Sequence, residues 1–354
     1  MEIDRRGFFK AAGAAGVALN AAAPAQAAPL TEKEKLARIA SNTWPLRYLF
    51  KGRTGFGRNA KNEAARAKYG QITMLDFPQF TKDVFPGVTH MDLFSGLFGD
   101  AADDAMYVSV PLTVGTATRV TQEFDPSSTA GKRWLEAMAN KMKATGTSCQ
   151  HISNNAPRDI CEPDAERRKT GVAVAKKWLD GAAILGAKSM RVNSGGPRLV
   201  PGAVAVAGDY PKADELAVYL KHCIESFKEM ADHGAKVGVK VTLENHWGLT
   251  ANPTNIRIII DEVKSPFCEA SPDFCNWEHE YLMYNGLKAL APYAHSNVHA
   301  KYWDRWKDNN DVRRSVRIMM DAGFEGTFAL EYEDGPWDGV EGAKYLYKEV
   351  LAAL

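Results

Sequence analysis

The chain has 354 residues, of which 44 are Lys or Arg and 43 are Asp or Glu, so its formal net charge at pH 7 is +1. This balance does not support a nucleic-acid-binding surface, which needs a basic excess. Apolar residues make up 45% of the chain, an ordinary fraction for a globular domain. After residue 30, no apolar run reaches the ~18 residues that a membrane helix requires.

Residues 1–30 are predicted to be a twin-arginine signal peptide. The segment DRRGFFK over residues 4–10 resembles the twin-arginine export motif, and a weakly apolar segment rich in Ala and Gly follows it. Ala25-Gln26-Ala27 then provides a small-x-small cleavage signal before Ala28. The alternative is an amphipathic N-terminal helix of the mature fold, which does not require this combination of signals. We therefore expect an exported, periplasmic protein that does not remain at the membrane after the leader is removed.

The five cysteines are odd in number and include no CxxC pair, so they indicate neither a zinc motif nor a complete disulfide framework. One or two bridges remain open for an exported protein. The candidates for pairing are Cys149, Cys161, Cys268 and Cys275, whereas Cys223 falls in a predicted helix and is expected to be a packing residue.

The chain after the leader alternates predicted helices and strands. We expect a short charged helix over 31–37, a first strand and its loop over 40–45, a basic surface loop over 52–68, a helix from Asp76 and a second strand over 87–94. Proline near the start of a helix, as at Pro78, is a common beginning.

Residues 95–129 are predicted to be an insertion after the second strand. Its segments 107–114 and 117–124 have strand-like sequences and could pair as a hairpin at the rim of the fold. The alternation then resumes with a helix from Asp125, a strand over 147–155, a helix over 163–185 that ends at Gly186, a strand over 187–196 and a helix over 213–234. It continues with strands that end at Glu244, Asp273, Lys301 and Glu331, and with helices from Pro253, Tyr281, Asn310 and Val340.

Eight predicted strands and eight predicted helices without an internal linker indicate an α/β protein. We interpret residues 31–354 as a single (β/α)8 TIM barrel with a rim insertion after strand two. The ~325 residues that remain after the leader fit such a barrel. The carboxyl ends of its strands would form one rim, where the active sites of these barrels lie.

Four ionisable residues in the second half of the chain recur at this rim. Val239, Val241 and Leu243 alternate as in a buried strand, and Glu244 follows directly. The steps to the other three are 29, 26 and 32 residues (244 to 273, 273 to 299 and 299 to 331), each about one strand-plus-helix unit. Three carboxylates and one imidazole that converge would bind one divalent ion of the Mn, Mg, Co or Zn kind. These four residues are Glu244, Asp273, His299 and Glu331.

These stretches resemble the xylose isomerase-like TIM barrel family, which contains sugar phosphate isomerases and epimerases. The likeness covers about residues 38–352. It rests on four segments in order: TLENH over 242–246, PDFCN over 272–276, NVHAK over 297–301 and LEYE over 330–333. In that family the Glu of strand five, the Asp of strand six, the His of strand seven and the Glu of strand eight bind one divalent metal, which the resemblance places on the same four residues.

Two features bear on which branch of the family the chain resembles. Cys275 stands where many relatives have glycine, which leaves the Asp273 ligand intact but could alter the loop. The endonuclease IV branch binds three metals through additional histidines. Here His222, His233 and His279 fall in predicted helices, which argues against that branch.

The chemistry that the resemblance implies is proton transfer next to a sugar carbonyl. Removal of the acidic C–H proton gives an enediolate, whose charge a divalent ion stabilises, and a base and an acid must serve the two faces of the carbon. Glu244 and Glu331 are the catalytic candidates for these roles, in addition to being ligands. The alternative is that both are ligands only.

Six residues are candidate substrate contacts, each with a simpler alternative. His246 could instead support Glu244, Lys301 could pair with Glu333, and Arg191 could form a rim salt bridge. Trp44, Phe94 and Trp247 could stack on a sugar or pack in the core, and placement of all three at the rim would favour carbohydrate. Asn154 is a weaker polar candidate, while His151 is interpreted as a core residue. The six candidates are His246, Lys301, Arg191, Trp44, Trp247 and Asn154.

Three functions follow from this interpretation. The first is a metal-dependent isomerase or epimerase of an unphosphorylated sugar, keto-sugar or cyclitol. The second is a periplasmic lyase or hydratase that uses the same metal and base for β-elimination from a 3-keto-glycoside. The third is a non-catalytic sugar-binding barrel, against which the complete ligand set argues. The expected partner is a small-molecule carbohydrate and not nucleic acid, and a homo-oligomer is left open.

Overall fold

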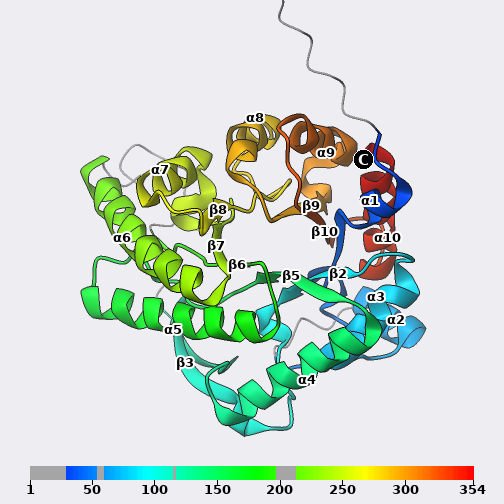
Figure 1. Ribbon diagram of the computed structural model, residues 1–354, viewed down its shortest axis with the longest axis horizontal. Coiled ribbons are helices and arrows are strands. Elements are labelled where there is room, and N and C mark those ends of the chain that lie inside the picture. The colour runs from blue at the N-terminus through cyan, green and yellow to red at the C-terminus, as the bar shows by residue number, and fades with distance from the viewer. Residues whose placement is uncertain (1–28, 54–59, 115–116, 197–212) are drawn as a thin grey trace, which may run out of the picture. The chain divides into compact units, whose positions relative to one another are not determined.

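A computed structural model describes residues 29–53, 60–114, 117–196 and 213–354, and Glu32–Leu354 form one compact unit. At its centre lies an eight-stranded sheet with the strand order β8-β7-β6-β5-β2-β1-β10-β9 (Figure 1). All pairs within this sheet are parallel. The strands are β1 (Ile39–Asn42), β2 (His90–Phe94), β5 (Ser148–Ser153), β6 (Ser189–Arg191), β7 (Lys240–Leu243), β8 (Cys268–Ala270), β9 (Asn297–Trp303) and β10 (Thr327–Asp334).

The sheet curls until its two ends meet. β1 pairs with both β2 and β10, so the first and last strands of the barrel are neighbours. The opposite ends meet just after β8, where Asp273 forms a parallel bridge with His299 of β9. The His299 amide donates to the Pro272 carbonyl at 3.0 Å, and the Phe274 amide donates to the His299 carbonyl at 3.1 Å. The predicted α/β TIM barrel is therefore confirmed.

Helices surround the strands (Figure 1). They are α1 (Glu32–Leu36), α2 (Ala60–Tyr69), α3 (Phe77–Val84), α4 (Thr129–Thr145), α5 (Ala165–Ile184), α6 (Ala213–Val237), α7 (Pro253–Val263), α8 (Glu280–Leu290), α9 (Val312–Asp321) and α10 (Gly339–Ala353). Short polar side chains at their N-termini accept hydrogen bonds from the first free amides, as Ser128, Asp164 and Asp338 do. No helix in this described part of the chain has the length and apolarity needed to cross a membrane.

The insertion after β2 is the predicted hairpin. β3 (Tyr107–Val114) and β4 (Ala117–Phe124) pair antiparallel, with Tyr107 opposite Phe124. Phe124 anchors the hairpin because its ring packs within 5.3 Å of Trp134 in α4 and within 5.8 Å of Trp178 in α5, measured between ring centroids. The hairpin therefore packs against α4 and α5, the helices before and after β5.

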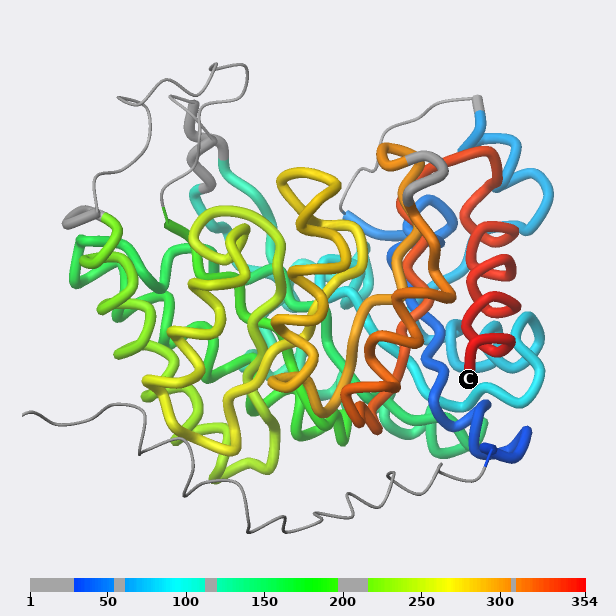
Figure 2. Tube along the Cα trace, turned by 90° about the horizontal axis from the view of Figure 1, so that it is seen from above, coloured from blue at the N-terminus to red at the C-terminus, as the bar shows by residue number. Residues whose placement is uncertain are grey.

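The expected loop over residues 52–68 is wrong over its second half, because α2 begins at Ala60. Basic composition predicted a solvated loop, but Asn62 and Ala65 are buried. The Tyr69 hydroxyl donates to Glu341 of α10 at 2.9 Å. Figure 2 shows the C-terminal helix beside these early segments. Packing against α10 thus stabilises a helix that local composition did not indicate.

Alternation along the strands separates apolar from polar side chains. In β10, Leu330 and Tyr332 are buried, and Glu331 lies between them in the sequence. Asp92 of β2 contacts His299 of β9, although these strands are separated by β1 and β10 in the sheet. The polar side chains therefore cross the inside of the barrel, which places ionisable groups at its centre.

Candidate active site: a metal centre below an aromatic cavity

The four predicted metal ligands meet inside the barrel. Glu244 directly follows β7, Asp273 follows β8, and His299 and Glu331 lie within β9 and β10. His299 Nδ1 lies 3.3 Å from Glu244 Oε2, 3.6 Å from Glu331 Oε2 and 4.0 Å from Asp273 Oδ2. All four residues are buried.

Two atoms of this cluster have no hydrogen-bond partner among the residues that the structure describes. They are His299 Nδ1 and Asp273 Oδ2, both buried. A buried polar atom without a partner is costly, so these two atoms are suited to binding a cation. One imidazole nitrogen and three carboxylates form a donor set that a divalent cation satisfies. Glu244, Asp273 and His299 also meet the distance requirement for a shared ion. The residues therefore fit the implied metal.

Asp92 fixes the orientation of His299. Asp92 Oδ2 lies 2.9 Å from His299 Nε2 and accepts from Asn297 Nδ2 at 3.1 Å, while Ser153 Oγ donates to Asp92 Oδ1 at 2.8 Å. Burial alone would raise the pKa of Asp92, but His151, His299 and Ser153 outweigh it and lower the pKa. The ionised carboxylate holds the proton on Nε2, so Nδ1 is the nitrogen that can offer its lone pair to an ion.

The Asp273 carboxylate is aimed by the loop after β8. Its Oδ1 accepts from the amides of Cys275 and Asn276, at 2.6 and 2.8 Å, and its own amide donates to Asn245 Oδ1 at 2.8 Å. Only Oδ2 remains for the centre. Cys275, which departs from the common glycine, contributes its amide here and places its thiol 3.2 Å from the Lys301 carbonyl. With cysteine at this position, the backbone amide still supports the Asp273 carboxylate.

Glu244 is held on both oxygens. Asn276 Nδ2 donates to its Oε1 at 2.9 Å, and an Arg191 guanidinium nitrogen donates to its Oε2 at 2.5 Å. Burial disfavours the ionised form, but Arg191 and His299 outweigh it and hold the pKa of Glu244 well below its usual range. Arg191 forms the ion pair that was the alternative to substrate contact, and it also lines the cavity described below.

Lys301 joins the ligands to a further carboxylate. Its ammonium lies 2.9 Å from Glu331 Oε1, 3.0 Å from Glu333 Oε2 and 3.5 Å from Asp273 Oδ2. Burial opposes its charge, but these carboxylates raise the pKa of Lys301 well above normal. Burial, together with the neighbouring carboxylates of Glu331 and Glu244, raises the pKa of Asp273 to about 7. The centre thus carries an excess of negative charge that a cation would neutralise.

A cavity of about 490 Å³ lies over these residues. Trp44, Phe94 and Trp247 all line it, which is the placement that favours carbohydrate. His246 also lines it and is an exposed residue. The cavity is also lined by Arg191, Asn276, Trp277, Lys301, Trp303, Glu331 and Glu333.

Asn154 is not part of this cavity, which corrects the expectation from the sequence. Its side chain is fully buried and bonds the backbone of Ala156 through both its amide nitrogen and its oxygen. The next residue, Asn155, lines the cavity instead. The chain turns directly after β5, so a shift of one residue exchanges the buried and exposed side chains.

His151 lies in β5 and is fully buried. Its Nδ1 is 2.8 Å from Ser189 Oγ, and its Nε2 has no hydrogen-bond partner among the described residues. Burial lowers the pKa of His151 to about 4, so the ring is neutral at pH 7. It is a buried residue, as expected, although only one of its two nitrogens is paired. The five cysteines are all buried and free, so no bridge forms among them.

Sequence reasoning missed Asp92, Asn276, Trp277 and Trp303 as site residues. Asp92 left one usable signal, because a carboxylate between Met91 and Leu93 in a strand is unusual in a buried position. Asn276 also stood within a segment that carried the family resemblance. The two tryptophans follow Asp273 and Lys301 closely in sequence but had no pattern that separated a cavity wall from core packing.

Residues 113–353 match the family model of the xylose isomerase-like TIM barrels, and the chain belongs to this family. Solved structures with the same fold include 3-keto-D-glucoside 4-epimerase from E. coli, which is 13% identical with a TM-score of 0.56 over 88% of this chain and 99% of that one. An L-ribulose 3-epimerase is 13% identical with a TM-score of 0.57, covering 90% of this chain and 95% of that one.

A xylose isomerase-like TIM barrel protein from Mycobacterium smegmatis, in complex with magnesium, is 18% identical with a TM-score of 0.54. The match covers 91% of this chain and 99% of that one. At these identities the likeness establishes the fold. Comparison of the sequence with curated proteins gives no match.

Proposed function

We propose that this protein is a metal-dependent sugar isomerase or epimerase that moves a proton at the carbon next to a carbonyl. The observation that carries the proposal is the convergence of three carboxylates on His299 Nδ1 beneath an aromatic-lined cavity. Glu244, Asp273, His299 and Glu331 would hold the ion. When bound, a divalent ion supplies Lewis-acid stabilisation of the negative charge that develops on the carbonyl and adjacent hydroxyl oxygens.

Glu331 and Glu244 are the proposed proton-transfer groups, and their surroundings differ. Glu331 lines the cavity and has one oxygen paired with Lys301. Glu244 is held by Arg191 and Asn276, and its depressed pKa makes it a weak base. Glu331 is therefore the better candidate to accept the carbon-bound proton, while Lys301, cationic in this setting, can donate a hydrogen bond to a substrate oxygen.

The cavity walls suit an unphosphorylated sugar. The rings of Trp44 and Phe94 lie 4.9 Å apart in an edge-to-face arrangement and offer an apolar wall for the C–H face of a sugar. His246 on another wall can donate to or accept from a hydroxyl. Two of the structurally similar proteins are named as epimerases of a keto-glucoside and of ribulose, which supports a sugar with a carbonyl next to the reacting carbon.

Solvent exchange tests the proposal. The metal-loaded protein is incubated in deuterium oxide with a panel of aldoses, ketoses, cyclitol ketones and 3-keto-glucosides, and each sugar is recovered and analysed. The proposal expects deuterium at one carbon of an intact sugar or of its isomer. Release of the group attached through the glycosidic oxygen would instead favour the 3-keto-glycoside lyase. Binding of sugars without exchange or cleavage would favour the non-catalytic barrel and overturn the enzymatic proposal.

We also propose that residues 1–30 direct export through the twin-arginine pathway; residues 1–28 lie outside the described structure. The support is the sequence alone: the paired Arg5 and Arg6 and the cleavage signal before Ala28. Expression of the full chain in a bacterial host with this pathway should give a periplasmic protein that begins at Ala28. Replacement of both arginines by lysine should retain the uncleaved chain in the cytoplasm.

A further inference from the structure

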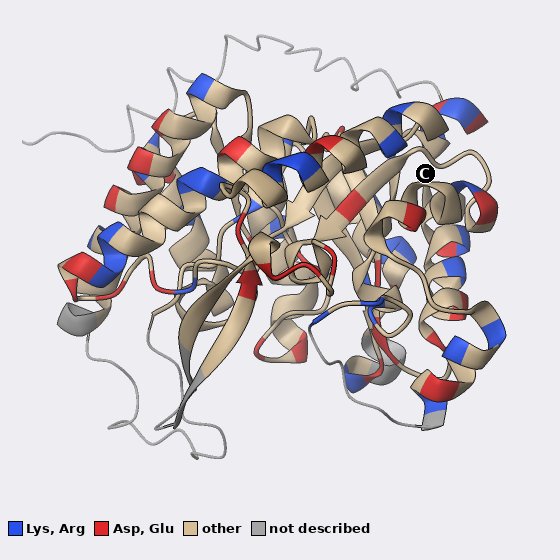
Figure 3. Ribbon diagram, turned by 90° about the horizontal axis from the view of Figure 1, so that it is seen from below, with Lys and Arg blue, Asp and Glu red and all other residues tan. Residues whose placement is uncertain are grey.

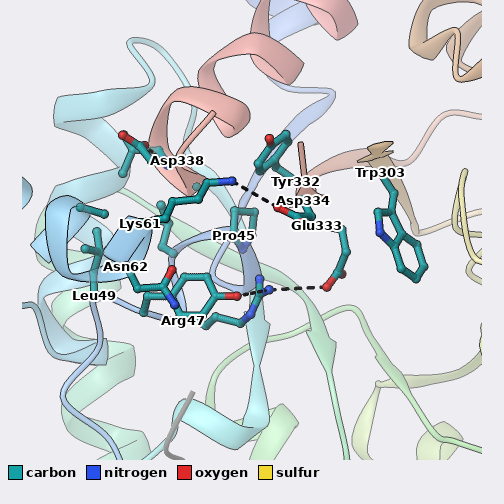
Figure 4. A pocket seen from close by; sticks show the side chains of 15 residues that line it. Pro45, Arg47, Leu49, Lys61, Asn62, Trp303, Tyr332, Glu333, Asp334 and Asp338 are labelled. Carbon is teal, nitrogen blue, oxygen red and sulfur yellow. Dashed lines mark hydrogen bonds and ion pairs between the residues drawn. The ribbon is translucent and has the colours of Figure 1, made fainter. Parts of the chain in front are cut away.

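A second cavity adjoins the one over the metal ligands. It has a volume of about 250 Å³ and lies between the turn η1 (Trp44–Leu46), helix α2 and the start of α10. Trp303 and Glu333 line both cavities. In Figure 4 these two side chains stand at one end of the second cavity, beyond Arg47. The two spaces are thus consecutive along the rim of the barrel.

A short chain of contacts connects the second cavity to the metal ligands. Glu333 Oε2 lies 3.0 Å from the Lys301 ammonium, which lies 2.9 Å from Glu331 Oε1. On its other side, Glu333 Oε1 lies 3.5 Å from the Arg47 guanidinium. A substrate ring that reaches the ligands would therefore have its far substituents at Glu333, at the entrance to the second cavity.

The second cavity carries charges of both signs. Lys61 pairs with Asp334 at 3.2 Å, and Arg47 faces Glu333 (Figure 4). Since each cation is matched by a carboxylate, an anionic group such as a phosphate gains little there. Hydroxyl groups can donate to the carboxylates and accept from the cations, so they satisfy both kinds of group at once. The chemistry favours a neutral, polyhydroxylated unit.

The walls are also ordered before a ligand arrives. The Arg47 guanidinium lies over the rings of Trp44 and Tyr48, at 4.2 and 4.4 Å from their centroids, and donates to the Trp44 carbonyl at 2.9 Å. Its side chain is only 7% exposed. Trp303 and Tyr332 add aromatic surface on the opposite side. Groups that are already fixed lose little entropy on binding, which favours a genuine subsite.

We propose that the second cavity binds the second sugar unit of a glycoside, so that the substrate has two units and its reacting ring occupies the cavity over the metal ligands. Ligand-binding clefts typically measure about 300–1,000 Å³, a range that the first cavity already meets for a single ring. A second cavity lined by fixed polar groups can contribute to binding only when the ligand is longer than one ring. The nature of the reacting ring rests on the proposed function, whereas the two-unit length rests on the second cavity.

Calorimetric binding to the metal-loaded protein tests the length of the ligand without requiring turnover. The probes are methyl β-D-glucoside and three glucose disaccharides that differ only in linkage: cellobiose, maltose and trehalose. The proposal expects at least one disaccharide to bind about tenfold or more tightly than the methyl glucoside, because it gains several hydrogen bonds in the second cavity. Equal affinities for all four sugars, or no binding of any of them, would overturn it.

A matched pair of substitutions on α2 tests whether the added affinity for the disaccharide arises in the second cavity. Ala65 is buried and lines the second cavity, whereas Ala67 is exposed on the same helix. Ala65→Leu should abolish the preference for the disaccharide while leaving affinity for the methyl glucoside unchanged, and Ala67→Leu should change neither. Lys61→Met, at a side chain that is 42% exposed, serves as a second test that retains the fold and should reduce the preference several-fold. A preference that survives both Ala65→Leu and Lys61→Met would overturn the subsite.

The two proposals fail in different ways. If the disaccharide preference is present and depends on Ala65 but no keto-sugar or keto-glycoside exchanges solvent deuterium, the isomerase proposal fails and the subsite stands. If exchange occurs with a monosaccharide as readily as with its glycoside, and Ala65→Leu affects neither, the subsite fails and the isomerase stands.

Discussion

Asp92 Oδ2 lies 2.9 Å from His299 Nε2, within a fully buried contact that joins β2 to β9 across the inside of the barrel. The two residues are 207 positions apart in the sequence. The other ring nitrogen of His299 faces three carboxylates and has no hydrogen-bond partner within the described part of the chain. Asp92 would therefore act on an ion bound by this cluster only through His299, by fixing the tautomer and the ring orientation.

Asp92→Asn should lower the affinity for a divalent ion. Asparagine removes the negative charge and can present its NH₂ group to Nε2, which favours the tautomer that protonates Nδ1. Loss of such an outer partner typically costs about 10–100-fold in metal affinity. Titration of the metal-free protein with Mn²⁺ measures this directly. Asp321→Asn, at an exposed position on α9, is the control and should bind as the wild type does. Unchanged affinity in Asp92→Asn would show that His299 needs no carboxylate partner.

Glu331→Gln should abolish solvent exchange at the sugar carbon while the protein stays folded. The amide can accept no proton, and loss of a positioned general base costs about 10²–10⁴-fold in rate. The exposed Glu325→Gln on the preceding loop is the matched control. Deuterium incorporation at the wild-type rate in Glu331→Gln, with a normal far-ultraviolet circular dichroism spectrum, would remove this residue from the mechanism.

Glu244→Gln should also abolish exchange, and it should destabilise the protein more than Glu331→Gln does. Arg191 is buried and donates to Glu244 at 2.5 Å, so the substitution leaves a buried cation without its partner, at a cost of about 3–5 kcal/mol. Lys301, by contrast, keeps Glu333 and Asp273 when Glu331 is replaced. Urea denaturation of both variants compares the losses. Equal unfolding free energies would contradict the asymmetry.

The barrel and the clustering of Glu244, Asp273, His299 and Glu331 could be predicted from the sequence because both follow from local rules. A strand period followed by an ionisable residue is visible within ten residues, as at Val239 to Glu244, and the repeat of this signal at unit spacing places the residues on one rim. The hairpin after β2 was visible for the same reason. Local patterns of this kind need no knowledge of the distant chain.

The features that sequence reasoning missed depend on distant contacts. Asp92 gains its role from a residue in β9, and α2 is stabilised by α10, at the other end of the described chain. The second cavity likewise forms where residues 45–65 meet residues 303–340. Asn154 was misplaced because its own backbone neighbour satisfies its amide. No local pattern encodes these pairings, so only the folded chain shows them.

Lys301→Met should destabilise the metal-free protein more than the metal-loaded one. Lys301 lies within 3.5 Å of carboxylate oxygens of Glu331, Glu333 and Asp273, and its loss leaves them uncompensated. Removal of one partner from a buried ion pair costs about 3–5 kcal/mol. A bound cation would supply part of the missing charge and reduce that loss. Urea denaturation in the presence of a chelator and of excess Mn²⁺ gives both values.

Lys240→Met is the control for this comparison. Lys240 pairs with the buried Glu269 at 2.6 Å in the neighbouring strand, and Glu269 is not a ligand. Its loss should therefore be the same with and without Mn²⁺. If Lys301→Met also loses the same unfolding free energy in both conditions, Lys301 does not share the charge of the metal centre.

His151→Gln should reduce the acid sensitivity of the fold. Burial lowers the pKa of His151 to about 4 in the folded protein, against an ordinary value near 6.5 when unfolded. Because the folded pKa is depressed, the stability is fully present above pH 6.5 and is lost as the pH falls toward 4, where only the unfolded chain takes up the proton. Between pH 7.5 and pH 5 this residue alone should cost the wild type about 2 kcal/mol of unfolding free energy.

Unfolding in urea at pH 7.5 and pH 5, for the wild type and His151→Gln in the presence of a chelator, measures the difference. Glutamine has no group that titrates in this range, so the variant should lose about 2 kcal/mol less than the wild type between the two pH values. The comparison cancels the contributions of the other histidines, because both proteins carry them. His233→Gln on α6 is the control for replacement of a histidine outside the barrel interior, where His233 pairs with Asp180. Identical pH dependence in the wild type and His151→Gln would mean that His151 titrates normally, and that the interior of the barrel below the metal centre is open to water.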